Sequence, residues 1–217
     1  MLGGLDHLVN NQHHAAMAPV KTRIQSQNRE IILDAALVVF SAFGFRGATV
    51  DGIAAKAFMS KPNLLYYFRR KEDIYVAVLE KILADWLEPL RKLDGEGDPI
   101  SELSNYLKAK LAMARAKPEA SRLFANEILH GAGMIGAFLS GPLKTLVDDK
   151  ATVIQGWIDA GRLRQTDPRH LIFAIWATTQ HYADFDVQVR AVLGGESDAA
   201  AAEKTLLGLI VNGLAPN

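Results

Sequence analysis

Apolar residues recur at every third or fourth position from Ile31 to the C-terminus, and few stretches alternate apolar with polar residues. The three-to-four spacing is typical of amphipathic α-helices, whereas half-buried strands alternate with a period of two. The hydrophobic pattern therefore predicts an all-α protein.

Cap residues divide this pattern into separate helices, the first of which is expected over residues 28–44. Asn28 suits its N-terminal cap, and Gly44 suits its C-terminal end because glycine adopts the left-handed conformation found there. The buried face of this helix is expected to comprise Ile31, Ala35, Val38 and Val39.

Two short helices come next, and they have the spacing of a helix-turn-helix. Thr49 can cap a helix over residues 50–57, and Ser60 can cap the following one, where Pro62 stands in the first turn and needs no N–H. In a DNA-binding helix-turn-helix the second helix enters the major groove, led by its N-terminal residues. An ordinary helical hairpin has the same spacing, so the spacing alone leaves both interpretations open.

The second short helix carries side chains that suit DNA. A hydroxyl, a cation and an amide near its start can bond to phosphate oxygens or base edges, and two tyrosines near its end can reach phosphates through their hydroxyls. Leu64 and Phe68 are expected in the core, and Arg69 and Arg70 stay open between phosphate contact and solvation. The candidate DNA-binding residues are Thr49, Ser60, Lys61, Asn63, Tyr66, Tyr67 and Lys71.

Charge distribution favours a polyanion partner for this region, although the formal net charge of the chain is zero. Residues 21–71 hold nine basic and three acidic side chains, whereas residues 72–217 hold fifteen basic and twenty acidic ones. A basic segment joined to an acidic body indicates a nucleic-acid-facing module attached to something else. Chance unevenness on a mixed-charge surface is the simpler alternative.

Composition limits the location and chemistry of the protein. The absence of Cys excludes disulfides and thiolate metal sites and fits the reducing cytoplasm. No apolar run approaches the roughly 18 residues of a membrane-spanning helix, and the first twenty residues do not have the pattern of a signal peptide. Residues 1–27 are instead expected to form a loosely ordered tail.

The rest of the chain predicts a larger helical body. A helix over residues 71–87 has Ile74, Val78, Ile82 and Trp86 on one stripe, and the cluster "DGEGDP" at 94–99 marks a hinge. Further helices are expected over 99–116, over 118–129, up to Ile158 with an interruption at Gly141-Pro142, over 168–194, and over 199–214.

Many weak positions in a fixed order across residues 32–79 resemble the TetR family of transcriptional regulators. The stretch reads "ILDAALVVFSAFGFRGATVDGIAAKAFMSKPNLLYYFRRKEDIYVAVL". Two positions depart from the family pattern: Phe58-Met59 replaces the usual Gly-Val of the turn, and Leu65 replaces a frequent Tyr. The resemblance implies a DNA-binding domain at 28–72 and a ligand-binding and dimerisation domain at 73–217. It also implies a homodimer on a palindromic operator, formed by the helices at 167–194 and 198–214.

The body resembles the pyrimidine-utilisation regulators within that family, in "EASRLF" and especially in "DPRHLIFAIWATTQHYADF". This resemblance implies a pocket for uracil or a related pyrimidine and places Trp86, Trp176 and Gln180 in it. Indole faces suit a flat ring, and a side-chain amide can donate and accept hydrogen bonds at once. Arg122 and Phe124 can add a donor and an apolar wall. The alternatives are a different planar or hydrophobic ligand, or two Trp that belong only to the core.

Two other kinds of site have weaker support. His181, Asp184 and Asp186 are close in sequence, but ligands on one helix do not define a metal site, so a surface or dimer contact is the better interpretation. An enzyme would need an acid or base pair in the pocket, and only Glu127 and His181 offer one. The sequence therefore favours a regulator without a cofactor or metal.

Overall fold

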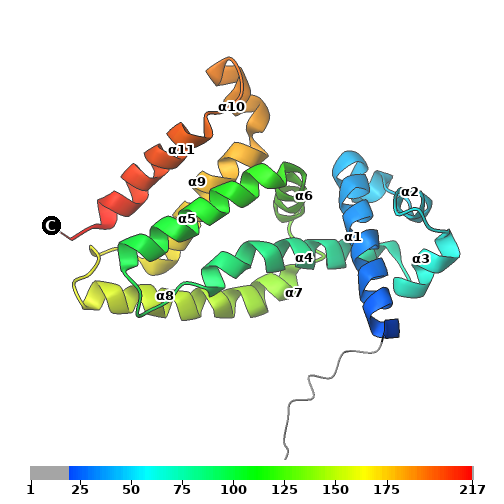
Figure 1. Ribbon diagram of the computed structural model, residues 1–217, viewed down its shortest axis with the longest axis horizontal. Helices are drawn as coiled ribbons and strands as arrows, with labels where there is room; N and C mark the ends of the chain where they lie inside the picture. Colours follow the sequence, from blue (N-terminus) through cyan, green and yellow to red (C-terminus); the bar gives the residue numbers. More distant parts are fainter. Residues whose placement is uncertain (1–19, 217) are drawn as a thin grey trace, which may run out of the picture.

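The computed structural model describes residues 20–216, and every regular element in that range is helical (Figure 1). The prediction of an all-α protein is thus confirmed. No helix among these residues is long and apolar enough to cross a membrane. The helices in chain order are α1 (Val20–Gly47), α2 (Val50–Lys56), α3 (Lys61–Tyr67), α4 (Lys71–Arg91), α5 (Pro99–Ala116), α6 (Pro118–Leu129), α7 (Gly136–Phe138), α8 (Lys144–Asp159), α9 (Pro168–Asp184), α10 (Asp186–Leu193) and α11 (Ala199–Leu206).

Helix α1 begins earlier than the sequence suggested. Residues 20–27, expected in a loosely ordered tail, are helical, so Asn28 lies inside the helix and is not its cap. Residues 1–19 of the expected tail lie outside the described part of the chain. The predicted end is confirmed, because Gly44 leaves the helical conformation with a φ of 66°.

The buried face of α1 differs by about one position from the predicted one. Ile31 and Val38 are exposed, whereas Ile32, Ala36 and Phe40 are fully buried. Ala35 and Val39 are buried as expected. The correction follows from the helices that α1 meets, since α2, α4 and α6 all pack against it.

Helices α2 and α3 begin where their caps predict. The Thr49 hydroxyl accepts a hydrogen bond from the Gly52 N–H at 3.0 Å, and the Ser60 hydroxyl accepts one from the Asn63 N–H at 3.4 Å. Each cap satisfies an N–H that the first helical turn leaves without a partner.

Helix α4 runs from the α1–α3 unit into the body without a break (Figure 1). The predicted stripe of Ile74, Val78, Ile82 and Trp86 is buried. One core cluster includes this stripe together with buried residues of α1, α2 and α3, and Leu90 near the end of α4 belongs to a second cluster inside the body. The same rigid helix therefore contributes to the cores of both parts.

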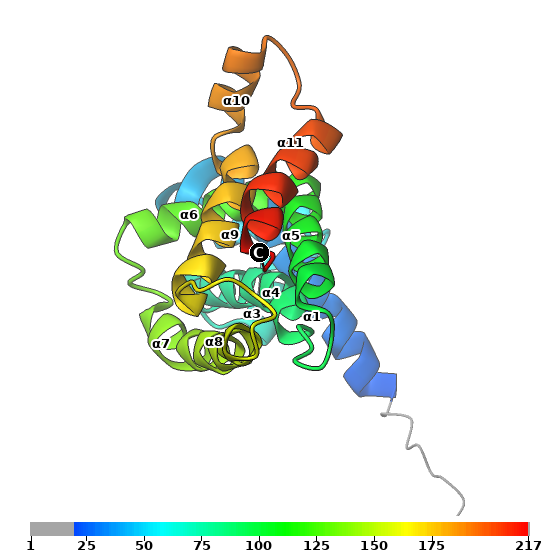
Figure 2. The same ribbon diagram turned by 90° about the vertical axis from the view of Figure 1, so that its left-hand side faces the viewer.

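In the body, α9 packs against α5, α6 and α8. Figure 2 shows α7 and α8 together on one side of this group and α10 projecting from the other. The helix predicted over 168–194 is in fact two helices, because Phe185 departs from helical geometry between α9 and α10. Gly194, at a φ of 71°, ends α10 as predicted. The interruption expected at Gly141-Pro142 is a π-helical turn over Leu139–Leu143.

Candidate DNA-binding surface and effector site

The N-terminal half of α3 presents its polar side chains to solvent. Ser60, Lys61 and Asn63 are exposed, while Leu64 is fully buried and holds the helix against the small core. Lys61 forms an ion pair with Asp51 at 2.8 Å, which ties the start of α3 to the start of α2. Both side chains are largely exposed, so this ion pair contributes little to stability.

The two tyrosines at the end of α3 are linked to α1. The Tyr66 hydroxyl accepts a hydrogen bond from the Gln25 amide at 3.2 Å, and the Tyr67 hydroxyl accepts one from the Asn28 amide at 2.8 Å. A phenol that accepts through oxygen keeps its own O–H for another acceptor. Both O–H groups are therefore available to donate to a phosphate, and the helical residues before Asn28 have a role that the sequence did not reveal.

Lys71 is engaged inside the protein. Its ammonium donates to the backbone carbonyls of Phe45 at 2.7 Å and Ala48 at 2.9 Å, and it lies 4.6 Å from the centroid of the Phe45 ring. Two of its three N–H groups are thus used to join the start of α4 to the α1–α2 connection. Its proposed phosphate contact can use only the remaining N–H.

The two arginines before α4 have different environments. Arg70 donates to Asp73 through Nη2 at 2.7 Å and through Nε at 3.4 Å, and its backbone N–H also donates to that carboxylate. Arg70 therefore acts as part of the N-terminal cap of α4. Arg69 is exposed.

In the body, the structure brings Trp86 and Phe124 together. Their ring centroids are 5.4 Å apart in an edge-to-face arrangement, which joins α4 to α6. The Lys110 ammonium, from α5, lies 4.9 Å from the centroid of the Trp86 ring. Trp86 also lines a groove of about 520 Å³ between α1, α4 and the α5–α6 junction.

Trp176 and Gln180 share one side of α9, one turn apart, and both are half-buried. The Trp176 indole N–H donates to the Tyr106 hydroxyl on α5, and the ring packs against both core clusters. Trp176 lines a second groove, also of about 520 Å³, next to Phe173 and Arg169. The two tryptophans therefore open onto different grooves.

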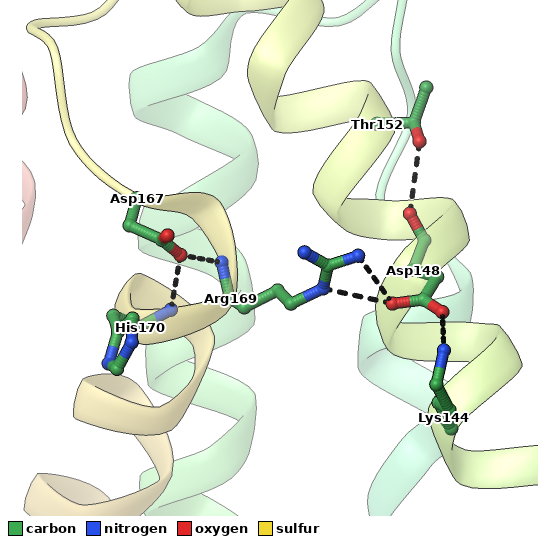
Figure 3. A network of polar contacts seen from close by, with 6 residues as sticks. All are labelled: Lys144, Asp148, Thr152, Asp167, Arg169 and His170. Atoms are coloured by element: carbon green, nitrogen blue, oxygen red, sulfur yellow. Dashed lines mark hydrogen bonds and ion pairs between the residues drawn. The ribbon is translucent and has the colours of Figure 1, made fainter.

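The rim of this second groove is a charged network (Figure 3). The Asp148 carboxylate accepts from Arg169 at 2.9 Å and from Lys144 at 2.5 Å, so it joins α8 to α9. Hydrogen bonds from the two cations hold the pKa of Asp148 below its usual range. Asp167 caps α9 beside this network by accepting the backbone N–H groups of Arg169 and His170.

Arg122 is exposed, unlike the other predicted pocket residues. It lies two positions from Phe124 on α6, and residues at that spacing do not face each other. Its charge acts instead on Asp184. Burial has the larger effect there and raises the pKa of the Asp184 carboxyl, while the positive charge of Arg122 acts to lower it. The structure therefore does not bring Arg122 to the Trp86–Phe124 pair.

Several polar residues of the body interior were missed at the sequence level. Lys110 is 5% exposed, and burial lowers its pKa to about 8, with the Asp184 charge acting in the opposite direction. Asp184 accepts a hydrogen bond from the buried Ser121, and burial raises the pKa of its carboxyl. A signal for Lys110 was present, because it occupies an apolar-stripe position one turn from Tyr106 and Ala114, and both are buried.

The residues of the two weaker interpretations have other partners. Glu127 accepts from the Tyr75 hydroxyl at 3.2 Å and from the Met134 N–H at 2.9 Å, while the His181 ring stacks on Phe185. Asp186 pairs with Arg190 at 3.0 Å. Among the described residues no group of three or more His, Cys, Asp or Glu side chains could hold a metal ion.

Comparison with known proteins assigns both parts of the chain. Residues 32–78 match the model described as "Bacterial regulatory proteins, tetR family", and residues 79–217 match "YcdC-like protein, C-terminal region". The chain belongs to the TetR family of transcriptional regulators. The boundary between the two TetR-family models falls inside α4, the helix that contributes to both cores.

Individual relatives in the TetR family agree with this assignment. The HTH-type transcriptional regulator RutR of Escherichia coli (strain K12) is 48% identical over 174 residues, which cover 80% of this chain and 82% of that protein. The HTH-type transcriptional repressor NicS of Pseudomonas putida is 30% identical over 146 residues, covering 67% and 68%. A TetR-like transcriptional regulator from Rhodococcus sp. RHA1 superposes with a TM-score of 0.64 at 26% identity, over 86% of this chain and 94% of that one. These relatives are transcriptional regulators and not enzymes.

In this TetR-family member Phe58 stands where the family usually has glycine, and the structure shows why glycine suits that position. Phe58 has a φ of 54°, in the left-handed region that favours glycine, the residue usual for the family at this point of the turn. Its side chain is 97% exposed. Leu65, at the other departure, is half-buried and carries no polar atom, so the tyrosines that follow it are the candidates for a phosphate contact.

Proposed function

We propose that the protein is a TetR-type repressor that binds operator DNA as a homodimer and is released by uracil or a related pyrimidine. The division into a DNA-binding unit at 28–72 and a ligand-binding and dimerisation unit at 73–217 is part of this proposal. Its main support is the continuity of α4. Lys71 attaches one end of this helix to the helix-turn-helix unit, and the other half carries Trp86 beside Lys110 and Phe124.

Operator binding is assigned to the exposed polar residues of the helix-turn-helix unit. Ser60, Lys61 and Asn63 lead α3 toward base edges and phosphates, and the Tyr66 and Tyr67 hydroxyls donate to phosphates. Thr49 and Lys71 contribute at the ends of α2 and α4 in addition to their internal bonds. A regulator that binds operator DNA must reach that DNA, so the proposed function implies a cytoplasmic protein.

The effector is assigned to the interior of the body between the two grooves, around Trp86, Phe124, Trp176 and Gln180. Helix α5 links the two tryptophans there, because Lys110 lies over the Trp86 ring and Tyr106, one turn away, accepts the hydrogen bond of Trp176. A pyrimidine has a flat face for the indoles and adjacent N–H and C=O groups that match one amide. The buried Lys110 adds a donor for a ring carbonyl. The resemblance of this part of the sequence to pyrimidine-utilisation regulators supports the pyrimidine. The apolar lining of the Trp86 groove favours, as the alternative, another planar or hydrophobic molecule.

Dimerisation is assigned to the last helices of the body. Phe173 on α9 and Val187 and Val192 on α10 are 46%, 83% and 79% exposed, and Leu209, after α11, is 71% exposed. Monomeric proteins rarely expose several large apolar side chains from neighbouring elements. Two copies that pair through these helices form a four-helix arrangement and present two copies of α3 to successive major grooves.

Operator titrations test the effector directly. Binding of the purified protein to operator DNA is measured at one fixed salt concentration with uracil, with thymine and with a purine control, because phosphate contacts make affinity steeply dependent on salt. Uracil should weaken operator binding, and operator should weaken uracil binding by the same factor. Equal uracil affinity with and without operator would exclude induction by uracil.

Two glutamine-to-alanine variants separate the pocket from the surface. Gln180→Ala should remove the response to uracil and leave operator binding in its absence unchanged. Gln165→Ala, at an exposed position in the connection between α8 and α9, is the matched control and should respond like the wild type. A normal uracil response in Gln180→Ala would remove Gln180 from the effector site.

A further inference from the structure

Phe58 is the most exposed large apolar side chain in the described part of the chain, at 97%. It occupies the turn between α2 and α3, two positions before the Ser60 cap of α3. In Figure 1 the α2–α3 pair lies at the end of the molecule that is farthest from α11. No packing within the protein accounts for an aromatic ring at this place.

The backbone conformation at Phe58 is unfavourable for a residue that has a Cβ. Its φ of 54° brings the Cβ close to a carbonyl oxygen, a crowding that glycine avoids because it has no Cβ. The turn is nevertheless closed, since the Phe58 N–H donates to Ala55 and the Met59 N–H donates to Ala54, at 3.1 and 3.0 Å. Glycine would fill the same turn without crowding, so the ring must contribute something that folding does not require. A strained residue in a functional element points to a role in that function.

The surroundings of Phe58 favour DNA as its partner. Phe58 is close in the chain to Lys56, Ser60 and Lys61, whose side chains are all exposed, and the segment has a strong excess of basic residues. The N-terminal residues of a recognition helix approach base edges in the major groove, and the turn that leads into α3 approaches with them. The apolar group that the major groove offers is the 5-methyl of thymine, which aromatic and other apolar side chains contact.

We propose that Phe58 is a specificity-determining residue that contacts the 5-methyl group of a thymine at the edge of each operator half-site. The inference rests on the operator binding proposed above and adds a base preference to it. Each protomer of the dimer supplies one Phe58, so the preferred thymine recurs symmetrically in the two half-sites.

The test compares Phe58→Gly with the wild type and with Phe58→Tyr. Glycine keeps the left-handed turn and removes the ring, whereas tyrosine keeps the ring and the crowding. Operator sequences are selected from random duplexes with the full-length wild-type protein. Each thymine of the selected operator is then replaced in turn by deoxyuridine, which lacks only the methyl group.

One thymine per half-site should be sensitive. Replacing it should weaken wild-type and Phe58→Tyr binding by about 3- to 10-fold, at the lower end of the effect of one base-pair change, and leave Phe58→Gly binding unchanged. Phe58→Gly should bind the thymine operator about tenfold more weakly than the wild type. Its Tm should rise by about 2–4 °C, which shows that the loss of affinity does not come from unfolding.

Other outcomes separate this inference from the proposed function. If the wild type selects no operator, operator binding itself is wrong. If Phe58→Gly binds the wild-type operator equally well, or loses affinity without any change in its sensitivity to deoxyuridine, then the thymine contact is wrong and operator binding stands. A lower Tm for Phe58→Gly would overturn the argument from backbone strain.

Discussion

Replacing Lys110 with Met should stabilise the effector-free protein, although it removes a side chain from the centre of the body. Lys110 is 5% exposed, and burial lowers its pKa to about 8, against 10.5 for a solvated lysine. A lowered pKa means that burial disfavours the charged form. Methionine has a similar length and no charge, so it fills the same space without this cost.

The magnitude follows from the two pKa values. A fall from 10.5 to about 8 corresponds to about 3 kcal/mol of unfavourable free energy for the protonated lysine at pH 7. The Trp86 ring, 4.9 Å from the ammonium, returns about 1 kcal/mol through its cation–π interaction. Lys110→Met should therefore raise the free energy of unfolding by about 2 kcal/mol, or the Tm by about 4–8 °C for a chain of this size.

The pH dependence has a definite sign. Below pH 8 the lysine is protonated in both the folded and the unfolded protein, so the full cost applies. Between pH 8 and 10.5 the unfolded chain binds more protons than the folded protein, and wild-type stability rises with pH relative to the variant. The advantage of Lys110→Met should therefore shrink across this window and be lost at its upper end.

Urea unfolding of the wild type and Lys110→Met at several pH values, at equal protein concentration, measures this difference. Lys108→Met on the same helix is the matched control, because the Lys108 side chain is half exposed and its ion pair with Glu203 is 4.0 Å long. Lys108→Met should change the free energy of unfolding by less than about 0.5 kcal/mol, as expected for a substitution on the surface. A Lys110→Met protein that is less stable than the wild type at pH 7, or whose advantage persists at pH 10.5, would refute the reasoning.

Three further substitutions probe the contacts that join the helices. Tyr67→Phe keeps the ring but removes the hydroxyl, so it loses both the free O–H and the acceptor of the Asn28 hydrogen bond. Operator affinity should fall about 3- to 10-fold, and the Tm should fall by about 2–4 °C, which corresponds to about 1 kcal/mol for the lost hydrogen bond. Equal affinity would remove this phosphate contact. Lys71→Met loses two hydrogen bonds to backbone carbonyls and should lower the free energy of unfolding by about 2 kcal/mol, measured by urea unfolding, with partial recovery in Lys71→Arg. Tyr106→Phe leaves the Trp176 indole N–H without its acceptor. This loss should shift the tryptophan fluorescence spectrum and weaken the response to uracil. An unchanged spectrum would show that the hydrogen bond does not hold the indole in place.

Features that depend on neighbours along the chain could be predicted without a structure. Thr49 and Ser60 cap their helices by bonding to N–H groups three residues away, so both caps could be identified from local sequence. The stripe through Ile74 and Trp86 has the period of one helix face, and it is buried as predicted. The fixed order of residues in the helix-turn-helix was enough to indicate the family.

Features that depend on which helices pack together could not be predicted from local sequence. The sequence indicated Lys71 as a DNA-binding residue, but the α1–α2 connection places two backbone carbonyls within hydrogen-bond distance of its ammonium. Arg70 stayed open between phosphate contact and solvation, and the structure pairs it with Asp73 at the start of α4. Phe185 interrupts a hydrophobic pattern that continues through it, because α9 packs against α5 and α6 while α10 leaves the bundle.

The candidate effector site shows the same division. The sequence indicated the aromatic residues, and the structure paired Trp86 with Phe124 but left Arg122 on the surface. It also placed the ammonium of Lys110 over the Trp86 ring. Helix periodicity predicts that a residue lies on an apolar face. It does not predict which side chains of other helices lie opposite, and those side chains set the burial, the pKa and the partner of each polar group.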